Sequence, residues 1–234
     1  MHLARSLYWG LLDLLYPPYC KSCGRRLDPF EKVICGSCWF TLQPSNLGNW
    51  RDAVTYHENI DCALTGWFMS DLLEKIIYGL KYHEQRALGG EIGGRLADMF
   101  KGVIRELNPD VMVPVPLYPA KGRERSFNQS DLIGRTVAGH LQIPYEPRLV
   151  KRVRNTKSQT ELSIDDRREN MAGAFAVGDL APHRRFLIVD DVLTSGATLS
   201  ECAKALRRKG ASFVAVLTAG TPPVHFTKNE KAGG

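Results

Sequence analysis

The residues with the clearest chemical potential in this 234-residue chain follow an apolar run near its carboxyl end. The run from Phe186 to Val189 predicts a short buried strand, and two adjacent carboxylates, Asp190 and Asp191, come directly after it. The residues that follow predict a loop that leads into a helix and carries several hydroxyl groups: Val192, Leu193, Thr194, Ser195, Gly196, Ala197 and Thr198.

This loop has the chemistry of a sugar-phosphate site. The start of a helix presents free backbone amides and the positive end of its dipole, and both suit a phosphate group. Asp190 and Asp191 cannot bind phosphate, but they can accept hydrogen bonds from ribose hydroxyls or hold Mg²⁺ in part through water. In an open parallel sheet, ligands bind at the carboxyl ends of the strands. An ordinary strand–loop–helix capped by threonine is the structural alternative.

A second cluster of reactive residues lies near the amino terminus, where four of the six cysteines form two C-x2-C pairs: Cys20, Cys23, Cys35 and Cys38. Each pair supplies two thiolates from one tight turn, and two such turns close a tetrahedral site around Zn²⁺. Disulfides, a redox-active C-x2-C and an iron–sulfur cluster are the alternatives, and we favour structural zinc. Because four protein ligands leave no open position, the ion would not be catalytic.

The elements that must position these residues alternate between strand and helix patterns. Strands are predicted at 53–56, 63–68, 110–115, 186–189 and 212–219. Helical stripes begin after a plausible cap at Ser70, run over 88–107, continue from a Ser126–Gln129 capping box to Leu141, and occupy 199–209. Glycines at the start of the 88–107 stripe predict close backbone packing there. This alternation predicts an α/β fold with a mainly parallel sheet and helices on both faces.

Composition and charge narrow the class of partner. A chain that is 44% hydrophobic is neither wholly disordered nor membrane-spanning, and a net charge of +6 favours an anionic partner. Residues 1–16 show leucines at helical spacing and no cleavage site, so we expect an amphipathic helix and a cytoplasmic protein. Five cations follow one another without an intervening acid, as in a solvated loop or an anion-binding one: Arg148, Lys151, Arg152, Arg154 and Lys157.

The segment from Asp190 to Thr198 resembles the signature of type I phosphoribosyltransferases, which bind phosphoribosyl diphosphate (PRPP). Further motifs resemble, in family order, the ComF family of bacterial competence and DNA-utilisation proteins. They are the four cysteines, Lys81-Tyr82, Val113-Pro114-Val115-Pro116-Leu117, Arg123 to Gln129, Arg152, Thr156 to Thr160 and Arg168 to Met171. Two positions depart from the family pattern: Ser126 replaces a glycine, and Ser195 replaces the second threonine of the loop.

The resemblance implies a type I phosphoribosyltransferase fold carrying a small four-cysteine zinc ribbon. We expect the helix and ribbon over 1–45, the phosphoribosyltransferase-like domain over 46–222 and a flexible tail over 223–234. Asp190 and Asp191 would orient the ribose as catalytic residues, with Mg²⁺ accompanying PRPP. Candidate contacts to the diphosphate or to DNA are Arg123, Arg125, Arg152 and Lys157, the last two in a long connection that could close as a lid.

Three functions remain open at this point. The family resemblance implies a protein of natural transformation that binds PRPP and single-stranded DNA at the inner face of the membrane, with a competence helicase as partner. Aromatic candidates for stacking on bases are Trp39, Phe40, Trp50, Tyr118 and Phe127. The alternatives are an active phosphoribosyltransferase of nucleotide metabolism that releases diphosphate, and a PRPP-binding regulator without turnover. No residue identifies itself as the base for an acceptor, so the sequence leaves enzymatic activity undecided.

Overall fold

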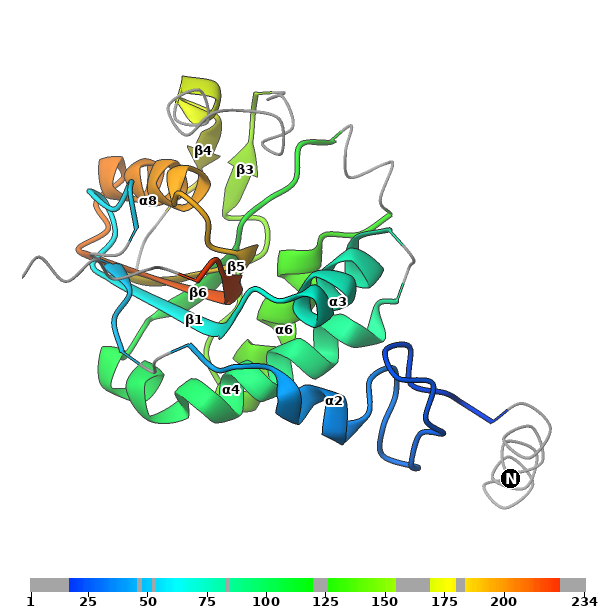
Figure 1. The fold of residues 1–234 in the computed structure, drawn as a ribbon. Helices are drawn as coiled ribbons and strands as arrows, with labels where there is room; N and C mark the ends of the chain where they lie inside the picture. Colours follow the sequence, from blue (N-terminus) through cyan, green and yellow to red (C-terminus); the bar gives the residue numbers. More distant parts are fainter. Residues whose placement is uncertain are drawn as a thin grey trace, which may run out of the picture.

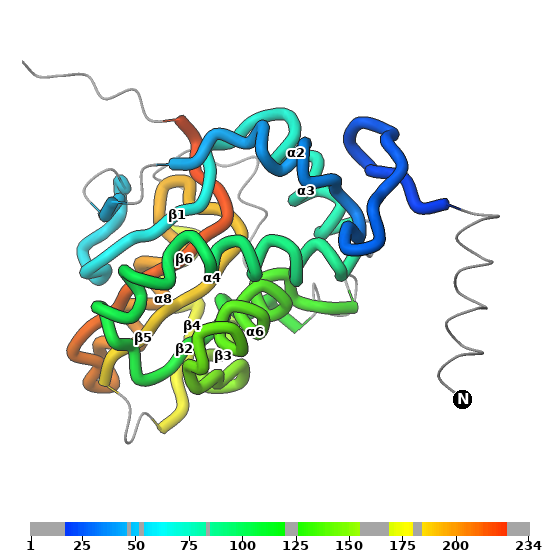
Figure 2. The backbone as a smooth tube through the Cα atoms, turned by 90° about the horizontal axis from the view of Figure 1, so that it is seen from below, coloured from blue at the N-terminus to red at the C-terminus, as the bar shows by residue number. Residues whose placement is uncertain are grey.

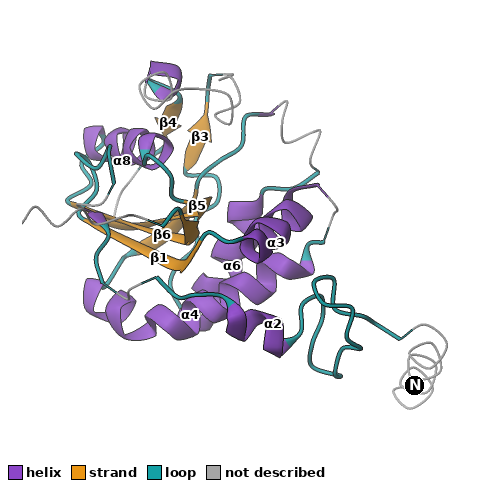
Figure 3. Ribbon diagram, in the orientation of Figure 1, coloured by secondary structure: helices purple, strands orange, loops and turns teal. Residues whose placement is uncertain are grey.

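A computed structural model describes residues 17–45, 48–51, 54–82, 85–119, 126–154, 169–179 and 184–223. Within them, a parallel sheet lies between helices on both of its faces (Figures 1 and 3). Its strands are β1 (Cys62–Phe68), β2 (Val111–Pro114), β5 (Arg185–Val192) and β6 (Phe213–Thr221). The helices are α2 (Gly36–Thr41), α3 (Asp71–Tyr82), α4 (Ala87–Leu107), α6 (Gln129–Leu141) and α8 (Ala197–Arg208). The predicted α/β class is confirmed.

The four strands run in the order β1-β6-β5-β2, and every neighbouring pair is parallel. Helices α4 and α6 cover one face, as the view from below shows (Figure 2), and α8 covers the other. Because β5 is covered on both faces, its residues Phe186 to Val189 are completely buried, which explains their continuous apolar run. A separate antiparallel pair, β3 (Val150–Arg152) with β4 (Phe175–Val177), lies on the α8 side.

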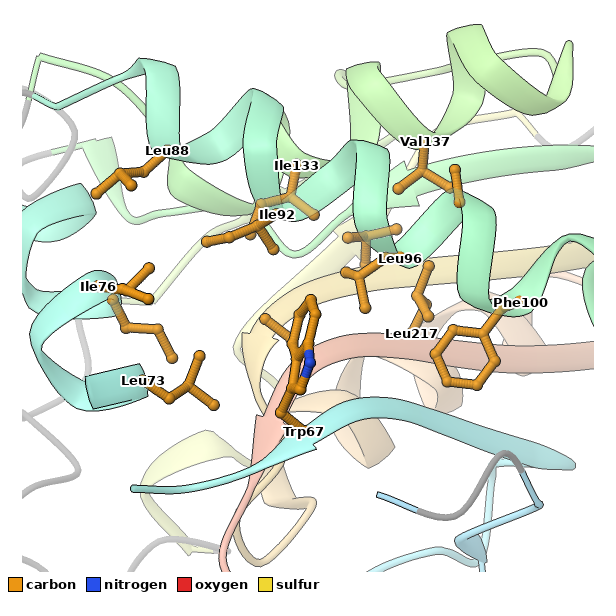
Figure 4. Packing of buried hydrophobic residues seen from close by; sticks show 14 of the residues in the cluster. Trp67, Leu73, Ile76, Leu88, Ile92, Leu96, Phe100, Ile133, Val137 and Leu217 are labelled. Atoms are coloured by element: carbon orange, nitrogen blue, oxygen red, sulfur yellow. The ribbon is translucent and has the colours of Figure 1, made fainter. Parts of the chain in front are cut away.

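The core on the α4 side is built from a helical stripe of large apolar residues (Figure 4). Ile92 and Leu96 of α4 point toward the sheet, whereas Leu88 lies against α3, where a Cβ atom on Gly79 would be 3.3 Å from its Cδ1. The predicted close approach of backbones occurs at the start of α4, because a Cβ atom on Gly93 would lie 2.7 Å from the carbonyl oxygen of Ile133 in α6. The glycines therefore let two helices touch through their backbones.

The start of α6 differs from the predicted capping box. Asn128 is the N-cap: its side-chain oxygen accepts a hydrogen bond from Ser130 N at 3.1 Å, and its amide nitrogen donates to Val115 O at 2.9 Å. Ser126 lies two residues before the cap with φ +56°, so the Ser126–Gln129 box is wrong although the helix is correct. The backbone keeps the left-handed conformation that the family's glycine would favour, with a serine in place.

The predicted strand over 53–56 is also wrong in the part that the structure describes. Val54 to Tyr56 make bends, and Tyr56 N donates to the carbonyl of Ser195 at 2.9 Å instead of joining the sheet. The expected cap of α3 is present, because Ser70 Oγ accepts from Leu73 N at 3.3 Å. The expected helix over 1–16 lies outside the described residues, as does the tail from 224 onward. Within the described ranges, no helix combines the length and apolar character needed to cross a bilayer.

Candidate ligand site and metal centre

The acid pair lies at the carboxyl end of β5, where side chains from α6 and α3 contact it. One carboxylate oxygen of Asp190 accepts hydrogen bonds from Ser130 Oγ at 2.7 Å and from Asp191 N at 2.9 Å. Lys81, at the end of α3, places its ammonium nitrogen 2.7 Å from a carboxylate oxygen of Asp191. Sequence reasoning assigned no role to Ser130 or to Lys81, although Lys81 belongs to one of the motifs that carry the family resemblance.

The electrostatic environment of Asp190 favours its protonated form. Burial, and to a smaller degree the neighbouring charge of Asp191, raise the pKa of Asp190 to about 7. The hydrogen bonds from Ser130 and from Asp191 N oppose this change, as does the positive charge of Lys81. Asp190 is thus a carboxyl group that changes its charge close to neutral pH.

The loop between the acids and α8 carries the features of an anion-binding turn. Gly196 is the N-cap residue of α8 with φ +82°, and as a glycine it has no side chain to cap the helix. Ser195 is buried, and its hydroxyl has no hydrogen-bond partner among the described residues. Val54 and Tyr56 pack against Gly196 on one side, while Thr194 is exposed to solvent.

Arg152 is the one candidate cation that the structure describes. It ends β3, where its guanidinium lies 5.9 Å from the ring centroid of Phe175 and donates to the sulfur of Met171 at 3.4 Å. Burial lowers the pKa of Arg152, and the charge of Asp190 opposes that change, which brings this cation into the field of the acid pair. Arg123, Arg125 and Lys157 lie outside the described residues, so their roles stay predictions.

The four cysteines of the amino-terminal pattern converge on one point. Their sulfur atoms all lie within 4.8 Å of one another, with 3.9 Å between Cys20 and Cys38 and 3.7 Å between Cys23 and Cys35. A tetrahedral zinc site with metal–sulfur bonds of about 2.3 Å requires sulfur atoms about 3.8 Å apart. These distances exceed a disulfide bond, and all six cysteines are free. The cluster can hold a metal ion.

Backbone amides support negative charge on these sulfur atoms. The N–H of Cys38 lowers the pKa of Cys35 to about 6 despite burial, whereas burial raises the pKa of Cys38 to about 12. Burial also opposes ionisation of Cys20, but amides that include that of Cys35, 3.3 Å from its sulfur, outweigh it and lower its pKa. Gly24, with φ +71°, closes the first turn by donating to Cys20 O.

Glu91 fastens the four-cysteine segment, residues 17–42, to α4. Its carboxylate accepts hydrogen bonds from Val33 N and from the indole nitrogen of Trp39, both at 2.9 Å. The ring centroids of Trp39 and of Trp67 in β1 are 5.7 Å apart. The guanidinium of Arg95 lies 4.6 Å from the centroid of the Trp39 ring. The segment therefore shares one hydrophobic core with the sheet.

Comparison with solved structures finds phosphoribosyltransferases. The purine phosphoribosyltransferase from Pyrococcus horikoshii is 21% identical, with a TM-score of 0.35, over 57% of this chain and 78% of that one. The glutamine PRPP amidotransferase from Bacillus subtilis is 22% identical, with a TM-score of 0.40, over 58% of this chain and 27% of that one. Scores of this size carry no argument, and no family model matches the chain.

The parallel sheet, the acid pair at the end of β5 and the appended cysteine cluster define an α/β protein with a potential metal centre. Among curated proteins, it is 39% identical to the DNA utilization protein YhgH of Escherichia coli K12 over 221 residues, 89% of each chain. It is 32% identical to Competence protein F of Haemophilus influenzae over 85% of this chain and 82% of the relative. The chain belongs to the family of these competence and DNA-utilization proteins.

Proposed function

We propose that this protein binds PRPP, or another ribose 5-phosphate, at the turn between β5 and α8, and that it acts on single-stranded DNA during DNA uptake or utilization. The observation that carries the ligand is the buried hydroxyl of Ser195. It has no partner among the described residues, and it lies in the loop that enters the start of α8, where the N-cap residue is the glycine Gly196. A phosphate at this place would accept hydrogen bonds from both.

Different residues around this turn would bind the phosphate, the ribose and the diphosphate. The exposed hydroxyl of Thr194 and the amides that follow Gly196 surround the phosphate, while Asp190 and Asp191 accept hydrogen bonds from the ribose hydroxyls. Arg152 and Lys81 are cations near the acids, and they can turn to the diphosphate of an incoming PRPP. Arg123, Arg125 and Lys157 are proposed to add to this clamp.

The two carboxylates of the site are also possible ligands for Mg²⁺. Carboxylate oxygens suit this ion, but Asp191 is already paired with Lys81, and Asp190 with Ser130. These residues fit a Mg²⁺ ion that arrives with the diphosphate and meets the acids through water. Such an ion would neutralise charge on the leaving diphosphate.

We infer that the four-cysteine cluster holds zinc in a structural role. The sulfur separations of 3.7 and 3.9 Å suit tetrahedral Zn²⁺, and all four positions are supplied by the protein. The ion would fix a segment whose own core is small and whose side chains complete the core beside α4.

The names of the relatives support the DNA part of the proposal, since they include Competence protein F and DNA utilization protein YhgH. A competence helicase as partner, and a cytoplasmic position at the inner face of the membrane, rest on the family resemblance alone.

An active phosphoribosyltransferase is the second candidate, and one observation favours it. The carboxyl group of Asp190 has its pKa near 7, which is the range in which a general base works best at neutral pH. In this function Asp190 would take a proton from an acceptor as the acceptor displaces diphosphate at the anomeric carbon. A regulator that binds PRPP without turnover would need the same site and no acceptor.

Calorimetric titration of the full chain with PRPP and Mg²⁺ tests the ligand, and a salt series with a labelled single-stranded oligonucleotide tests the DNA. We expect PRPP binding that is lost in the Asp190→Asn, Asp191→Asn double variant, and DNA binding that weakens with salt. Diphosphate release with a panel of nucleobase and amine acceptors separates the transferase from the regulator. A chain that binds neither PRPP nor ribose 5-phosphate contradicts the assignment of the site.

A further inference from the structure

Large apolar side chains that are exposed to solvent gather on two neighbouring elements. Among the described residues there are six, of which Tyr19, Phe30 and Phe40 belong to the four-cysteine segment and Tyr78 and Tyr82 to α3. The sixth, Val153, lies elsewhere and is not aromatic. A protein surface normally scatters such residues singly, so the adjacent rings of Tyr78 and Tyr82 on α3 mark a surface for interaction.

A cleft of about 580 Å³ lies where these two elements meet. Lys21, which follows the first metal-binding cysteine, lines it from the four-cysteine segment, and Lys75 and Tyr78 line it from α3. The remaining lining residues are Asp71, Glu74, Gly79 and Gln85. The cleft therefore combines two ammonium groups with an exposed ring and has acids at the end where α3 begins.

The second tyrosine extends this surface toward the acid pair. The rings of Tyr78 and Tyr82 lie one helical turn apart with centroids separated by 4.7 Å, and each is more than half exposed. Tyr82 directly follows Lys81, whose ammonium contacts Asp191 at 2.7 Å. The cleft, the two rings and the candidate sugar-phosphate site thus follow one another along α3.

We propose that the surface formed by Tyr78, Tyr82, Lys21 and Lys75 binds single-stranded nucleic acid, with bases stacked on the tyrosine rings and phosphates held by the lysines. Every base has a face that can stack on an aromatic ring, and interleaved cations serve the backbone. The inference rests on the DNA part of the proposed function and names the surface for it. Two tryptophans expected to stack on bases, Trp39 and Trp50, are only 3% and 4% exposed and cannot do so.

Exposed rings with charged neighbours favour nucleic acid over a protein partner on this surface. A protein interface is poor in charged residues at its centre, whereas here two lysines and two acids line the same cleft as Tyr78. Because Asp71 and Glu74 offset the two lysines in the cleft, stacking contributes more than phosphate contacts. The proposal therefore predicts that removal of a ring weakens binding more than removal of either lysine.

Fluorescence anisotropy of a labelled 20-mer oligo-dT with the full chain at low salt tests the proposal. Tyr78→Ala and Tyr82→Ala should each weaken binding about tenfold or more, and the double variant further. Tyr78→Phe and Tyr82→Phe keep the ring and should bind within about twofold of the wild type. Phe30→Ala is the matched control, because Phe30 is an exposed ring of the four-cysteine segment that does not line the cleft. Thermal melting checks that each variant is folded.

The outcomes separate this inference from the function on which it rests. If the wild type binds the oligonucleotide and the alanine variants bind it equally well, this surface is refuted while DNA binding stands. If the wild type does not bind at low salt, both are refuted, whereas the PRPP titration still reports on the acid pair. If the alanine variants keep DNA binding but lose self-association in sedimentation, the surface is a protein interface and the inference is wrong.

Discussion

The ammonium group of Lys81 lies 2.7 Å from the carboxylate of Asp191, and this contact joins the end of α3 to the end of β5. Both side chains are mostly buried, with 25% and 14% of their areas exposed, so the ion pair is only weakly screened by solvent. Asp190, the preceding residue, has Ser130 as its own partner. One cation thus neutralises one acid of the pair, while the other acid is held near the point of protonation.

The charge of Asp190 makes stability depend on pH in a direction opposite to that of most aspartates. Its folded pKa of about 7 lies above the ordinary value of 3.8, so the folded state binds the proton more tightly. Stability from this group is fully present below about pH 4 and is lost as the pH rises through about 7. We expect Asp190→Asn to raise the melting temperature by roughly 4 °C or more at pH 8 and by much less at pH 5.

Differential scanning fluorimetry across this pH range provides the measurement. The same variant should lose affinity for ribose 5-phosphate, because an amide is a weaker acceptor for the ribose hydroxyls than a carboxylate. If the melting temperature falls equally at both pH values, ionisation of the buried Asp190 carboxyl does not destabilise the folded protein, and the prediction is wrong.

Replacement of Lys81 by methionine should have the opposite effect on stability. The variant leaves Asp191 without its cation beside Asp190, so the pKa of Asp190 should rise further, since Lys81 lowers it in the wild type. We expect Lys81→Met to cost about 2 kcal/mol of unfolding free energy at pH 8 and less at pH 5. Urea denaturation at the two pH values measures this, with Lys101→Met, an exposed lysine of α4, as the control. Equal losses at both pH values would rule out the electrostatic cause.

Ser195 allows binding and stability to be separated. Its hydroxyl is buried without a partner, so Ser195→Ala should leave stability unchanged or raise it by about 1 kcal/mol. The same change should weaken ribose 5-phosphate binding about tenfold, because a buried donor to the phosphate is removed. Calorimetric titration and thermal melting measure the two effects. If Ser195→Ala binds the sugar phosphate as tightly as the wild type, the hydroxyl does not face the ligand.

The site could be predicted from the sequence only where its parts are consecutive. Asp190, Asp191 and the following loop lie in one short segment, so their types and order suffice to predict a strand end, a turn and a helix start. Ser130 is 60 residues away from Asp190 and reaches it only because α6 begins at the same edge of the sheet. Such a contact depends on tertiary packing, and a single sequence gives no distance between separate elements.

Predictions from local residue preference were also wrong where a contact with a distant residue decides the conformation. Val54 and Tyr56 are typical strand residues, yet Tyr56 N bonds to Ser195 O and the segment covers the loop. Ser126 has the residue type of a helix cap, but Asn128 takes that role because it can bond to Val115 O as well. The four-cysteine cluster was predictable because its ligand spacing is itself local.

Removal of the metal should release the four-cysteine segment. We expect elemental analysis to find about one zinc ion per chain, and Cys35→Ser to lose it. Because Trp39 is buried against Trp67 and bonded to Glu91, loss of the ion should shift tryptophan emission to longer wavelength. Cys62→Ala is the control, since Cys62 is buried in β1 and lies outside the cluster. A chain purified without zinc that keeps the emission of the wild type would contradict the structural role.

Alanine substitutions at two adjacent glycines of α4 test the close contact between α4 and α6, because we expect one to lower and the other to raise the stability of the protein. A Cβ atom on Gly93 would lie 2.7 Å from the carbonyl oxygen of Ile133 and 2.7 Å from Cβ of Thr136, so Gly93→Ala forces the two helices apart. The nearest atom to a Cβ on Gly94 is Cε1 of His140 at 4.0 Å, which is ordinary contact. Because alanine favours a helix over glycine, Gly94→Ala should stabilise the protein by about 0.5–1 kcal/mol, whereas Gly93→Ala should destabilise it by about 2 kcal/mol or more.

Urea denaturation of the two variants measures this difference directly. Since α6 carries Ser130 at its start, displacement of the helix in Gly93→Ala should also weaken ribose 5-phosphate binding, while Gly94→Ala should not. Equal stability of the two variants would show that α4 and α6 are not packed through their backbones at this point.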